Sequence, residues 1–411
     1  MNEKNLSLVS SLVVTCTSII ACNGGANSSV ANPRVNNSVN LVVDGGINGT
    51  ALNRSYITLT ICQVGTSNCQ TIDHIVVDSG STGLRINQSA LTVGGLTPLS
   101  YNGAPIYQCM QYAAGYAFGP VVNLDLRIAG ESAFNIPVQI FEYNNPDMVP
   151  NSCSYGMPPA NLATGFGANG IIGINPISNP NNDYTPGGVY TCDSNTCTEV
   201  SNPNNIPQVL NINPIAAFVN DNNGAIFSLP KVSSAATMES QLGTLTFGLN
   251  TQDNNQVSNS VSKLLGSPNT DTWPVGFFIA NTGSQNTVAM FDSGTPTYSM
   301  NVPIPFCTSP YDNVYCPANG PYTIISMLSG VYGGTLIPLT STIVNYSYLG
   351  GFTNVMPYLG QSIVSIPSVA NTLYGLPAFF GNNIYLGFKG AGSSGSVTPL
   401  GQGPAWGISS N

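Results

Sequence analysis

The chain has 411 residues, of which 42% are hydrophobic and only 6% are charged, and its formal net charge at pH 7 is −9. Its 8 Lys and Arg residues are scattered, which excludes the basic patch expected of a nucleic-acid-binding protein. The chain has a single histidine, His74, which excludes zinc sites built from two or three histidines. Catalysis of the Ser-His-Asp or Cys-His type would depend on this one imidazole. Any enzymatic chemistry is therefore expected to depend mainly on carboxylates, hydroxyls and backbone groups.

The N-terminus has the features of an export signal. Residues 1–21 are predicted to be a signal peptide, because the apolar stretch at 6–21 is shorter than the roughly 20 apolar residues that a membrane span needs. Residues 19–22, Ile-Ile-Ala-Cys, resemble the lipobox of bacterial lipoproteins, in which the cysteine becomes the lipidated N-terminus. We expect an exported bacterial lipoprotein, anchored to a membrane through Cys22 and facing the periplasm or the cell surface. An ordinary cleavage site is the alternative. The polar residues 22–38 are expected to form a flexible tether.

The rest of the chain is long enough for two lobes. It has about 370 residues, more than one hydrophobic core usually organises. We place an N-terminal lobe at 39–230 and a C-terminal lobe at 231–411. The 44 Gly, 30 Pro and short β-branched runs between turns predict strands and loops, and long amphipathic patterns are absent. The predicted fold class is all-β with few short helices.

Eight cysteines lie beyond the signal region, and they are predicted to form disulfides. Eight cysteines allow 105 pairings, but three pairs are close in sequence. Metal binding is the alternative, but the sequence contains no C-x-x-C, no histidine accompanies the pairs, and an export signal favours oxidation. The three close pairs, followed by the pair left by elimination, are Cys62–Cys69, Cys192–Cys197, Cys307–Cys316 and Cys109–Cys153.

One short pattern occurs twice, about 210 residues apart. "IVVDSGSTGLRI" covers residues 75–86 and "VAMFDSGTPTYSM" covers residues 288–300. Each is an apolar run typical of a buried strand, followed by Asp, a hydroxyl residue, Gly and a second hydroxyl residue. By chance the four-residue motif is expected about 0.05 times per chain, and a lone copy would be read as an ordinary strand exit. Two copies indicate a function.

The repeated motif suits a pair of catalytic carboxylates, Asp78 and Asp292. Glycine allows a sharp turn and a close approach by another backbone, so each carboxylate can meet its twin from the other half. Two adjacent carboxyl groups cannot both ionise easily and share one proton. The ionised group can take a proton from water while the protonated group hydrogen-bonds a carbonyl oxygen.

With these two motifs the chain resembles the pepsin-like aspartic proteases over most of residues 40–390. The resemblance implies a bilobal double β-barrel with the active site between the lobes. Asp78 and Asp292 would be the catalytic pair. Ser79 and Ser293 would form a lattice of hydroxyl groups between the lobes, while Gly80, Ser81, Gly294 and Thr295 would support the carboxylates.

Further segments resemble other parts of that fold. An apolar-apolar-Gly element braces each active-site loop, and it resembles residues 171–173 in the first half and 379–381 in the second. Residues 111–119, "QYAAGYAFG", are similar to the flap hairpin, with Tyr112 at the flap-tyrosine position and Gly115 at the turn.

The boundary between the lobes also has counterparts, and two positions depart from the family pattern. Residues 206–219 and 224–230 resemble the helix and strand that close the first lobe, and 242–248 would open the second. Arg85 stands where many pepsins have a tryptophan, and we interpret it as a solvent-facing residue at a strand end, with a hydrogen bond near the flap as the alternative. Pro296 occupies a position where a small hydroxyl residue is more usual.

The sequence therefore predicts an aspartic endopeptidase without a metal or organic cofactor. "VDSGSTGLR" and "GLPAFFGNNIYLG" resemble a bacterial pepsin-like lipoprotein family. The expected partners are a peptide or protein substrate and, through the lipid anchor, a membrane. We expect a monomer that does not bind nucleic acid. The alternative is a pepsin-fold lipoprotein that binds a peptide or another ligand without cutting it. A glycosidase with paired carboxylates fits poorly, because the Gly-linked hydroxyl residues would have no role in it.

Overall fold

The protein is described from a computed structural model. Residues 35–411 form one compact unit. The predicted signal peptide, the lipidation site Cys22 and all but the last residues of the tether lie outside the described residues, so these remain predictions. The structure describes residues 36–112, 115–141, 148–160, 165–179, 185, 187–232, 240–268, 276–283, 286–309, 311–346, 354–363, 371–389 and 397–411.

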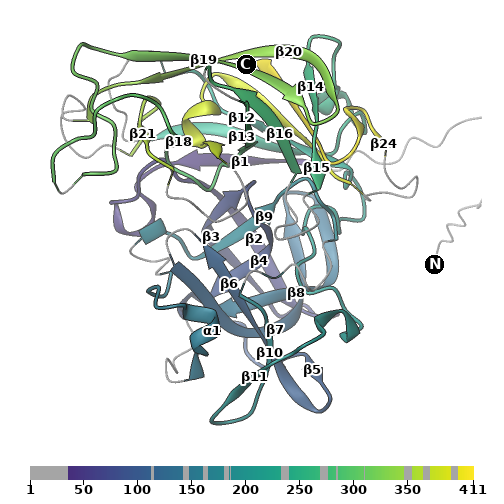
Figure 1. Cartoon of the computed structure of the whole chain (residues 1–411). Coiled ribbons are helices and arrows are strands. Elements are labelled where there is room, and N and C mark those ends of the chain that lie inside the picture. Colours follow the sequence, from purple (N-terminus) through teal and green to yellow (C-terminus); the bar gives the residue numbers. More distant parts are fainter. Residues whose placement is uncertain are drawn as a thin grey trace, which may run out of the picture. The chain divides into compact units, whose positions relative to one another are not determined.

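Strands dominate the first half of the chain, as Figure 1 shows. They are β1 (Ser38–Val43), β2 (Ser55–Gln63), β3 (Cys69–Asp78), β4 (Thr82–Asn87), β5 (Ser100–Tyr101), β6 (Ala104–Tyr112), β7 (Gly115–Ile128), β8 (Glu131–Phe141), β9 (Gly170–Ile174), β10 (Val189–Cys192) and β11 (Cys197–Glu199).

The second half also consists mainly of strands (Figure 1). They are β12 (Gly224–Ser228), β13 (Gln241–Phe247), β14 (Ser262–Leu265), β15 (Ser267–Pro268), β16 (Gly276–Asn281), β17 (Asn286–Phe291), β18 (Tyr298–Met300), β19 (Tyr322–Gly330), β20 (Gly333–Ile343), β21 (Gly360–Gln361), β22 (Thr372–Tyr374), β23 (Asn382–Gly387), β24 (Val397–Thr398), β25 (Gly401–Gln402) and β26 (Ala405–Ser410).

Helices in the described part of the chain are single turns, which confirms the predicted all-β class. None of them is long and apolar enough to cross a membrane. They are the α-helix α1 (Asn151–Ser154) and the 3-10 turns η1 (Gly46–Asn48), η2 (Gln88–Ala90), η6 (Pro203–Asn205), η7 (Asp253–Asn255) and η9 (Leu376–Ala378).

One large sheet joins strands from both halves of the sequence. Its order is β11-β10-β6-β7-β8-β4-β9-β3-β2-β1-β13-β12-β23-β26-β14. The first strand of the N-terminal half, β1, pairs with β13 along its whole length, from Ser38↔Thr246 to Val43↔Gln241. The predicted lobe border at 230/231 therefore lies between neighbouring strands of one sheet, and the residue bounds given to each lobe remain a prediction.

A second sheet carries the other repeat of the Asp motif. Its order is β20-β19-β16-β17-β22-β18-β21. Both sheets share one continuous core, in which strand residues of alternating polarity bury their apolar side chains. In β2, for example, Ile57, Leu59 and Ile61 are buried while Thr58 is exposed. Strand β9, "GIIGI", is buried throughout, as expected of a strand with a parallel neighbour.

Aromatic side chains fill the core below the second Asp motif. The ring of Phe291, at the end of β17, lies 5.0 Å from Phe278, 5.7 Å from Trp406 and 6.1 Å from Phe379, measured between centroids. These edge and tilted contacts bury large apolar surfaces and hold the strand end in place. The aromatic run at 377–388 thus contributes its apolar side chains to the core.

All four predicted disulfides are present: Cys62–Cys69, Cys109–Cys153, Cys192–Cys197 and Cys307–Cys316. The first closes the β2–β3 hairpin and the third closes the β10–β11 hairpin, because each joins two residues that lie opposite each other in paired strands. Four disulfides are typical of extracellular and periplasmic proteins.

The helix expected at 206–219 does not form. Residues 206–219 run through bends and turns, and strand β12 follows as predicted. Pro207 and Pro214 each remove a backbone donor and restrict the preceding residue. The side chains of Asn211 and Asn213 are buried and bond to groups outside this segment or to nearby backbone, which competes with helical hydrogen bonds.

Candidate active site

Each Asp motif follows a strand that has a parallel neighbour. Strand β3 ends at Asp78, which lies opposite Gly173 of β9. Strand β17 ends at Phe291, opposite Tyr374 of β22, and the backbone N–H of Asp292 donates to the Tyr374 carbonyl at 3.0 Å. The two motifs therefore leave their sheets in the same way, which brings each aspartate to a strand end.

The second bracing element differs from the prediction. The first, residues 171–173, lies beside the Asp78 loop as expected, but its counterpart is 373–375, Leu-Tyr-Gly, rather than 379–381. An added Cβ on Gly173 would lie 2.7 Å from the Ser81 carbonyl carbon, and one on Gly375 would lie 2.1 Å from the Thr297 oxygen. Both glycines are required because the loops pass directly over them. Phe379 instead belongs to the aromatic core.

Two further glycines allow the aspartates to come together. A Cβ on Gly80 would lie 2.7 Å from the Asp292 carboxyl carbon, and a Cβ on Gly294 would lie 2.5 Å from Oδ1 of Asp78. Each carboxyl group thus packs against the glycine of the opposite motif. Neither contact is compatible with a larger residue. The structure therefore brings together the two predicted catalytic aspartates, which are 7% and 8% exposed.

Each carboxyl group receives the same pair of hydrogen bonds from its own loop. Asp78 accepts from the Gly80 N–H at 2.8 Å and from the Ser81 hydroxyl at 2.5 Å. Asp292 accepts from the Gly294 N–H at 3.0 Å and from the Thr295 hydroxyl at 2.7 Å. These bonds orient the carboxyl groups and stabilise their charged forms. Ser81, Thr295 and the two glycines lie where the resemblance placed them.

A closed lattice of four hydrogen bonds joins the two loops beneath the carboxyl groups. The Ser79 N–H donates to the Ser293 hydroxyl at 3.0 Å, and the Ser293 N–H donates to the Ser79 hydroxyl at 2.9 Å. The Ser79 hydroxyl donates to the Phe291 carbonyl at 2.9 Å, and the Ser293 hydroxyl donates to the Val77 carbonyl at 2.7 Å. Both serines are fully buried, so the lattice fixes the separation of the loops.

Burial sets the protonation of the pair. It raises the pKa of Asp292 to about 7, and the charge of Asp78 and a hydrogen bond with it act in the same direction. The bond from Thr295 and the charge of Arg54 oppose this rise. The two carboxyl groups are therefore suited to sharing one proton below neutral pH. In the described part of the chain, no cluster of three or more His, Cys, Asp or Glu is placed to hold a metal ion.

The predicted flap is a hairpin of β6 and β7, in which Tyr112 pairs with Gly115. Its turn, residues 113–114, lies outside the described residues. Gly115 has φ 147°, and a Cβ there would lie 2.4 Å from the Pro158 carbonyl oxygen, which explains the glycine. The hydroxyl of Tyr112 is buried without a hydrogen-bond partner. Burial raises the pKa of Tyr112 to about 12, so this hydroxyl is a neutral donor.

Arg85 does not face solvent, contrary to the prediction. It is 1% exposed, because β4 lies between β8 and β9. Its Nε donates to the Gln139 side chain at 3.1 Å, and its Nη2 donates to the Asn211 side chain and the Thr82 carbonyl, both at 3.0 Å. Gln139 in turn donates to the flap-strand carbonyl of Ala117 at 3.2 Å. Where many pepsins have a tryptophan, this chain connects its active-site strand to the flap through polar side chains.

Three buried asparagines hold the loops and were not singled out from the sequence. Asn175 donates to the Ser79 carbonyl at 2.9 Å, and Asn213 donates to the Asn175 carbonyl at 2.8 Å. Asn53 donates to the Pro296 carbonyl at 2.7 Å. In a chain rich in asparagine, nothing local marks these three, since their partners lie far away in sequence.

His74 lies on β3, four residues before Asp78, and is not part of the paired-aspartate site. Its Nδ1 is 3.2 Å from a carboxylate oxygen of Asp73, and its Nε2 is 3.6 Å from one of Asp44. Its ring lies 5.2 Å from that of Tyr56. The histidine therefore lies within the strand, beside two carboxylates.

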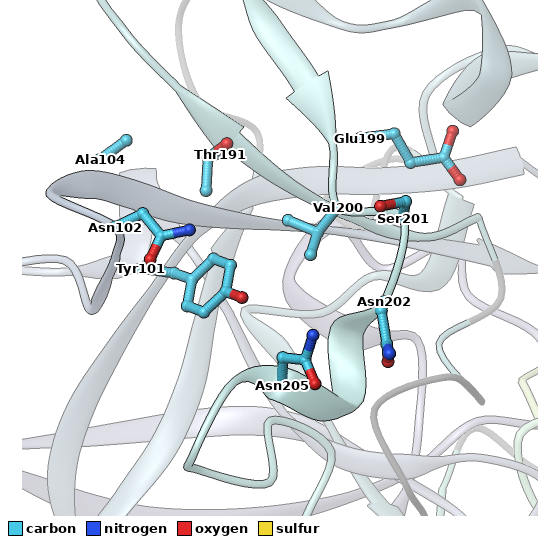
Figure 2. Close-up of a pocket in the computed structure, with 9 residues that line it drawn as sticks. All are labelled: Tyr101, Asn102, Ala104, Thr191, Glu199, Val200, Ser201, Asn202 and Asn205. Atoms are coloured by element: carbon cyan, nitrogen blue, oxygen red, sulfur yellow. The ribbon is translucent and has the colours of Figure 1, made fainter.

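A separate hollow of about 320 Å³ lies beside the β10–β11 hairpin. Figure 2 shows the ring of Tyr101 and the side chain of Val200 facing each other across it, with Asn102 and Asn205 nearby. None of the predicted site residues lines it. The hairpin that Cys192 and Cys197 close thus lines a hollow of its own.

Comparisons with known proteins agree with this geometry. Among solved structures, the chain is similar to an aspartic proteinase from Irpex lacteus, with 13% identity and a TM-score of 0.51 over 91% of this chain and 97% of that chain. At this identity the likeness shows the fold alone, and it confirms the predicted pepsin-like bilobal fold. No curated protein sequence matches the chain. Residues 33–406 match a family described as "Protein of unknown function (DUF3443)".

Proposed function

We propose that this chain, which belongs to the DUF3443 family, is an aspartic endopeptidase that hydrolyses peptide bonds with a water molecule held by Asp78 and Asp292. The observation that carries the proposal is the reciprocal arrangement of the two Asp motifs. Each aspartate packs against the glycine of the other motif, and the lattice of Ser79 and Ser293 fixes the pair. A structural role alone does not require two adjacent buried carboxyl groups, which repel each other when both are charged.

The reaction uses the single proton that the pair shares. Asp292, whose pKa burial raises to about 7, is the protonated member and donates a hydrogen bond to the peptide carbonyl oxygen. The carboxylate of Asp78 takes a proton from the bound water, and the water oxygen adds to the carbonyl carbon. The carbonyl oxygen receives the proton of Asp292, which gives a neutral tetrahedral diol. As the C–N bond breaks, Asp78 donates its proton to the leaving nitrogen and Asp292 takes a proton from one hydroxyl of the diol, which gives an acid and an amine and restores the pair.

The flap covers the substrate in this scheme. The Tyr112 hydroxyl is a buried donor without a partner in the described structure, so an acceptor oxygen of the substrate would satisfy it. The peptide would lie extended along the flap hairpin. No metal or organic cofactor enters the reaction, because the proton transfers are complete with the two aspartates and one water.

We also propose where the enzyme acts. Four disulfides fit an oxidising compartment, and the Ile-Ile-Ala-Cys run would attach the chain to a membrane through a lipid on Cys22. The enzyme would act as a monomer facing the periplasm or the cell surface, on peptides or proteins and not on nucleic acid. Metabolic labelling with a radioactive fatty acid tests the anchor, and Cys22→Ser must abolish the label.

A peptide-library experiment tests the activity. The purified protein is incubated with a mixed library between pH 3 and 7, beside Asp78→Asn, Asp292→Asn and a transition-state inhibitor of aspartic proteases. Cleavage that both variants lose and the inhibitor blocks is the expected result. Cleavage that survives in either variant would remove the pair from the mechanism. The absence of products from a protein with all four disulfides formed would favour a binding protein with a pepsin-like fold.

A further inference from the structure

One basic side chain lies beside the paired aspartates and takes no part in the proposed reaction. Arg54 comes directly before β2, next to Asn53, whose side chain donates to the carbonyls of Pro296 and Met356, both at 2.7 Å. Asn53 also has φ 44° and accepts from the Met356 N–H at 2.7 Å. The residue before Arg54 is thus fixed to the segment that follows the Asp292 motif, which holds the arginine at the site.

The guanidinium group of Arg54 is held by an aromatic ring and lacks hydrogen-bond partners at one end. Its Cζ lies 4.3 Å from the centroid of the Phe166 ring. The ring is itself held, because the Tyr56 hydroxyl donates to the Phe166 carbonyl at 2.6 Å. Nη1 of Arg54 is buried and has no hydrogen-bond partner in the described structure. A cation–π contact orients the group but leaves its N–H donors free.

The position of this cation is costly without a ligand. Burial lowers the pKa of Arg54, and the neighbouring Tyr56, Asp292 and Asp78 act against this. Arginine keeps its proton nevertheless, so a charged group remains whose buried Nη1 has no hydrogen-bond partner in the described structure. The chain contains only 8 basic residues and carries a net charge of −9, so this cation does not belong to a general positive surface.

A second unsatisfied donor lies on the same aromatic ring. The ring of Tyr112 is 6.5 Å from that of Phe166, and its hydroxyl is also buried without a partner. Phe166 therefore has a cationic donor and a neutral donor as neighbours. A carboxylate accepts hydrogen bonds only, and it pairs with arginine through two parallel bonds. An amide or ammonium group offers no such match.

We propose that Arg54, with Tyr112, forms a subsite for a carboxylate of the substrate, so that this endopeptidase selects peptides with an acidic residue near the cleaved bond. The inference rests on the proposed function, and it names the class of substrate. The carboxylate comes from an Asp or Glu side chain or from the C-terminus of a short peptide, and both sources present the same chemistry to the guanidinium group.

Matched peptides test this subsite. An octapeptide library carries Glu, Gln or Lys at one position at a time, with either a free or an amidated C-terminus, and kcat/KM is measured for each peptide. A charged hydrogen bond made in the bound state predicts a preference for Glu over Gln of about tenfold or more at one position. Arg54→Gln is expected to abolish the preference, and Arg54→Lys to restore part of it.

The control is Arg127→Gln, which removes the same charge from an exposed position on β7 and must leave the preference unchanged. A preference for the free over the amidated C-terminus, lost in Arg54→Gln, would support the subsite and assign the carboxylate to the peptide end. Equal rates for Glu and Gln peptides at every position and for both kinds of C-terminus would overturn the inference. So would a Glu preference that survives in Arg54→Gln, or an effect of Arg54→Gln on the pH profile alone.

A binding measurement separates this inference from the proposed function. If the wild-type chain cleaves nothing, the proposed activity fails, but the subsite is still tested by fluorescence anisotropy with labelled Glu and Gln peptides and the Asp292→Asn protein. Tighter binding of the acidic peptide, lost on adding Arg54→Gln, supports the subsite. Equal affinities for the Glu and Gln peptides, and for their free and amidated C-termini, refute it.

Discussion

Substitution of Ser293 by alanine is expected to destabilise the protein through the lattice below the paired aspartates. The Ser293 hydroxyl accepts from the Ser79 N–H and donates to the Val77 carbonyl, at 3.0 and 2.7 Å. Alanine leaves both of these buried backbone groups unpaired. Each unpaired group costs about 1–3 kcal/mol, so the free energy of unfolding should fall by at least about 2 kcal/mol.

Urea denaturation at pH 5 measures this loss. Ser258→Ala is the matched control, because it removes an exposed hydroxyl bonded only to Ser260 and should change the free energy of unfolding by less than about 0.5 kcal/mol. Ser79→Ala breaks the other two bonds of the lattice and should cost a similar amount, since each serine hydroxyl makes two of the four bonds. A loss for Ser293→Ala no larger than that of the control would refute the role given to the lattice.

Three further changes have expected outcomes. Burial and Asp221 raise the pKa of Glu131 to about 7. The contribution of Glu131 to the free energy of unfolding is therefore complete below about pH 4.5 and is lost as the pH rises through about 7. Glu131→Gln should remove about 2–3 kcal/mol of this pH-dependent change, as measured by thermal melts at several pH values. Replacing Cys109 and Cys153 by serine opens a loop with a sequence separation of 44. The free energy of unfolding, measured by urea denaturation, should fall by about 4 kcal/mol, and a fall of less than about 1 kcal/mol would contradict this. Arg85→Met should lower the free energy of unfolding by about 3 kcal/mol or more, because it leaves the buried side-chain oxygens of Gln139 and Asn211 without their donor. The same substitution at a solvent-facing position would change the free energy of unfolding very little.

Features that depend on local sequence were predictable. The Asp loops, the flap strands and the three short-range disulfides are encoded within a few residues, and the fourth disulfide follows by elimination. The supporting glycines and hydroxyl residues follow from the repeated motif, because their hydrogen bonds reach only two or three residues along the chain.

Features that depend on distant partners were not predictable. Arg85 has Leu84 and Ile86 as neighbours, so strand alternation points it outward, but its acceptors on Gln139 and Asn211 are 54 and 126 residues away. The second bracing element was placed six residues too late, because two apolar-Gly runs occur in succession and only the pairing of β17 with β22 selects 373–375.

The central claim is that Asp292 supplies the proton of a catalytic carboxyl pair, and a pH profile tests it most directly. The measurement is kcat/KM between pH 3 and 9 for one cleaved peptide, with the wild type and Asp292→Asn. Burial and Asp78 raise the pKa of Asp292 to about 7, so activity should fall about tenfold per pH unit above about 7. Asp292→Asn should be inactive and at least as stable as the wild type at pH 7, since it removes a buried acid. Activity that rises through pH 7, or a folded Asp292→Asn protein that still cleaves the peptide, would contradict the account.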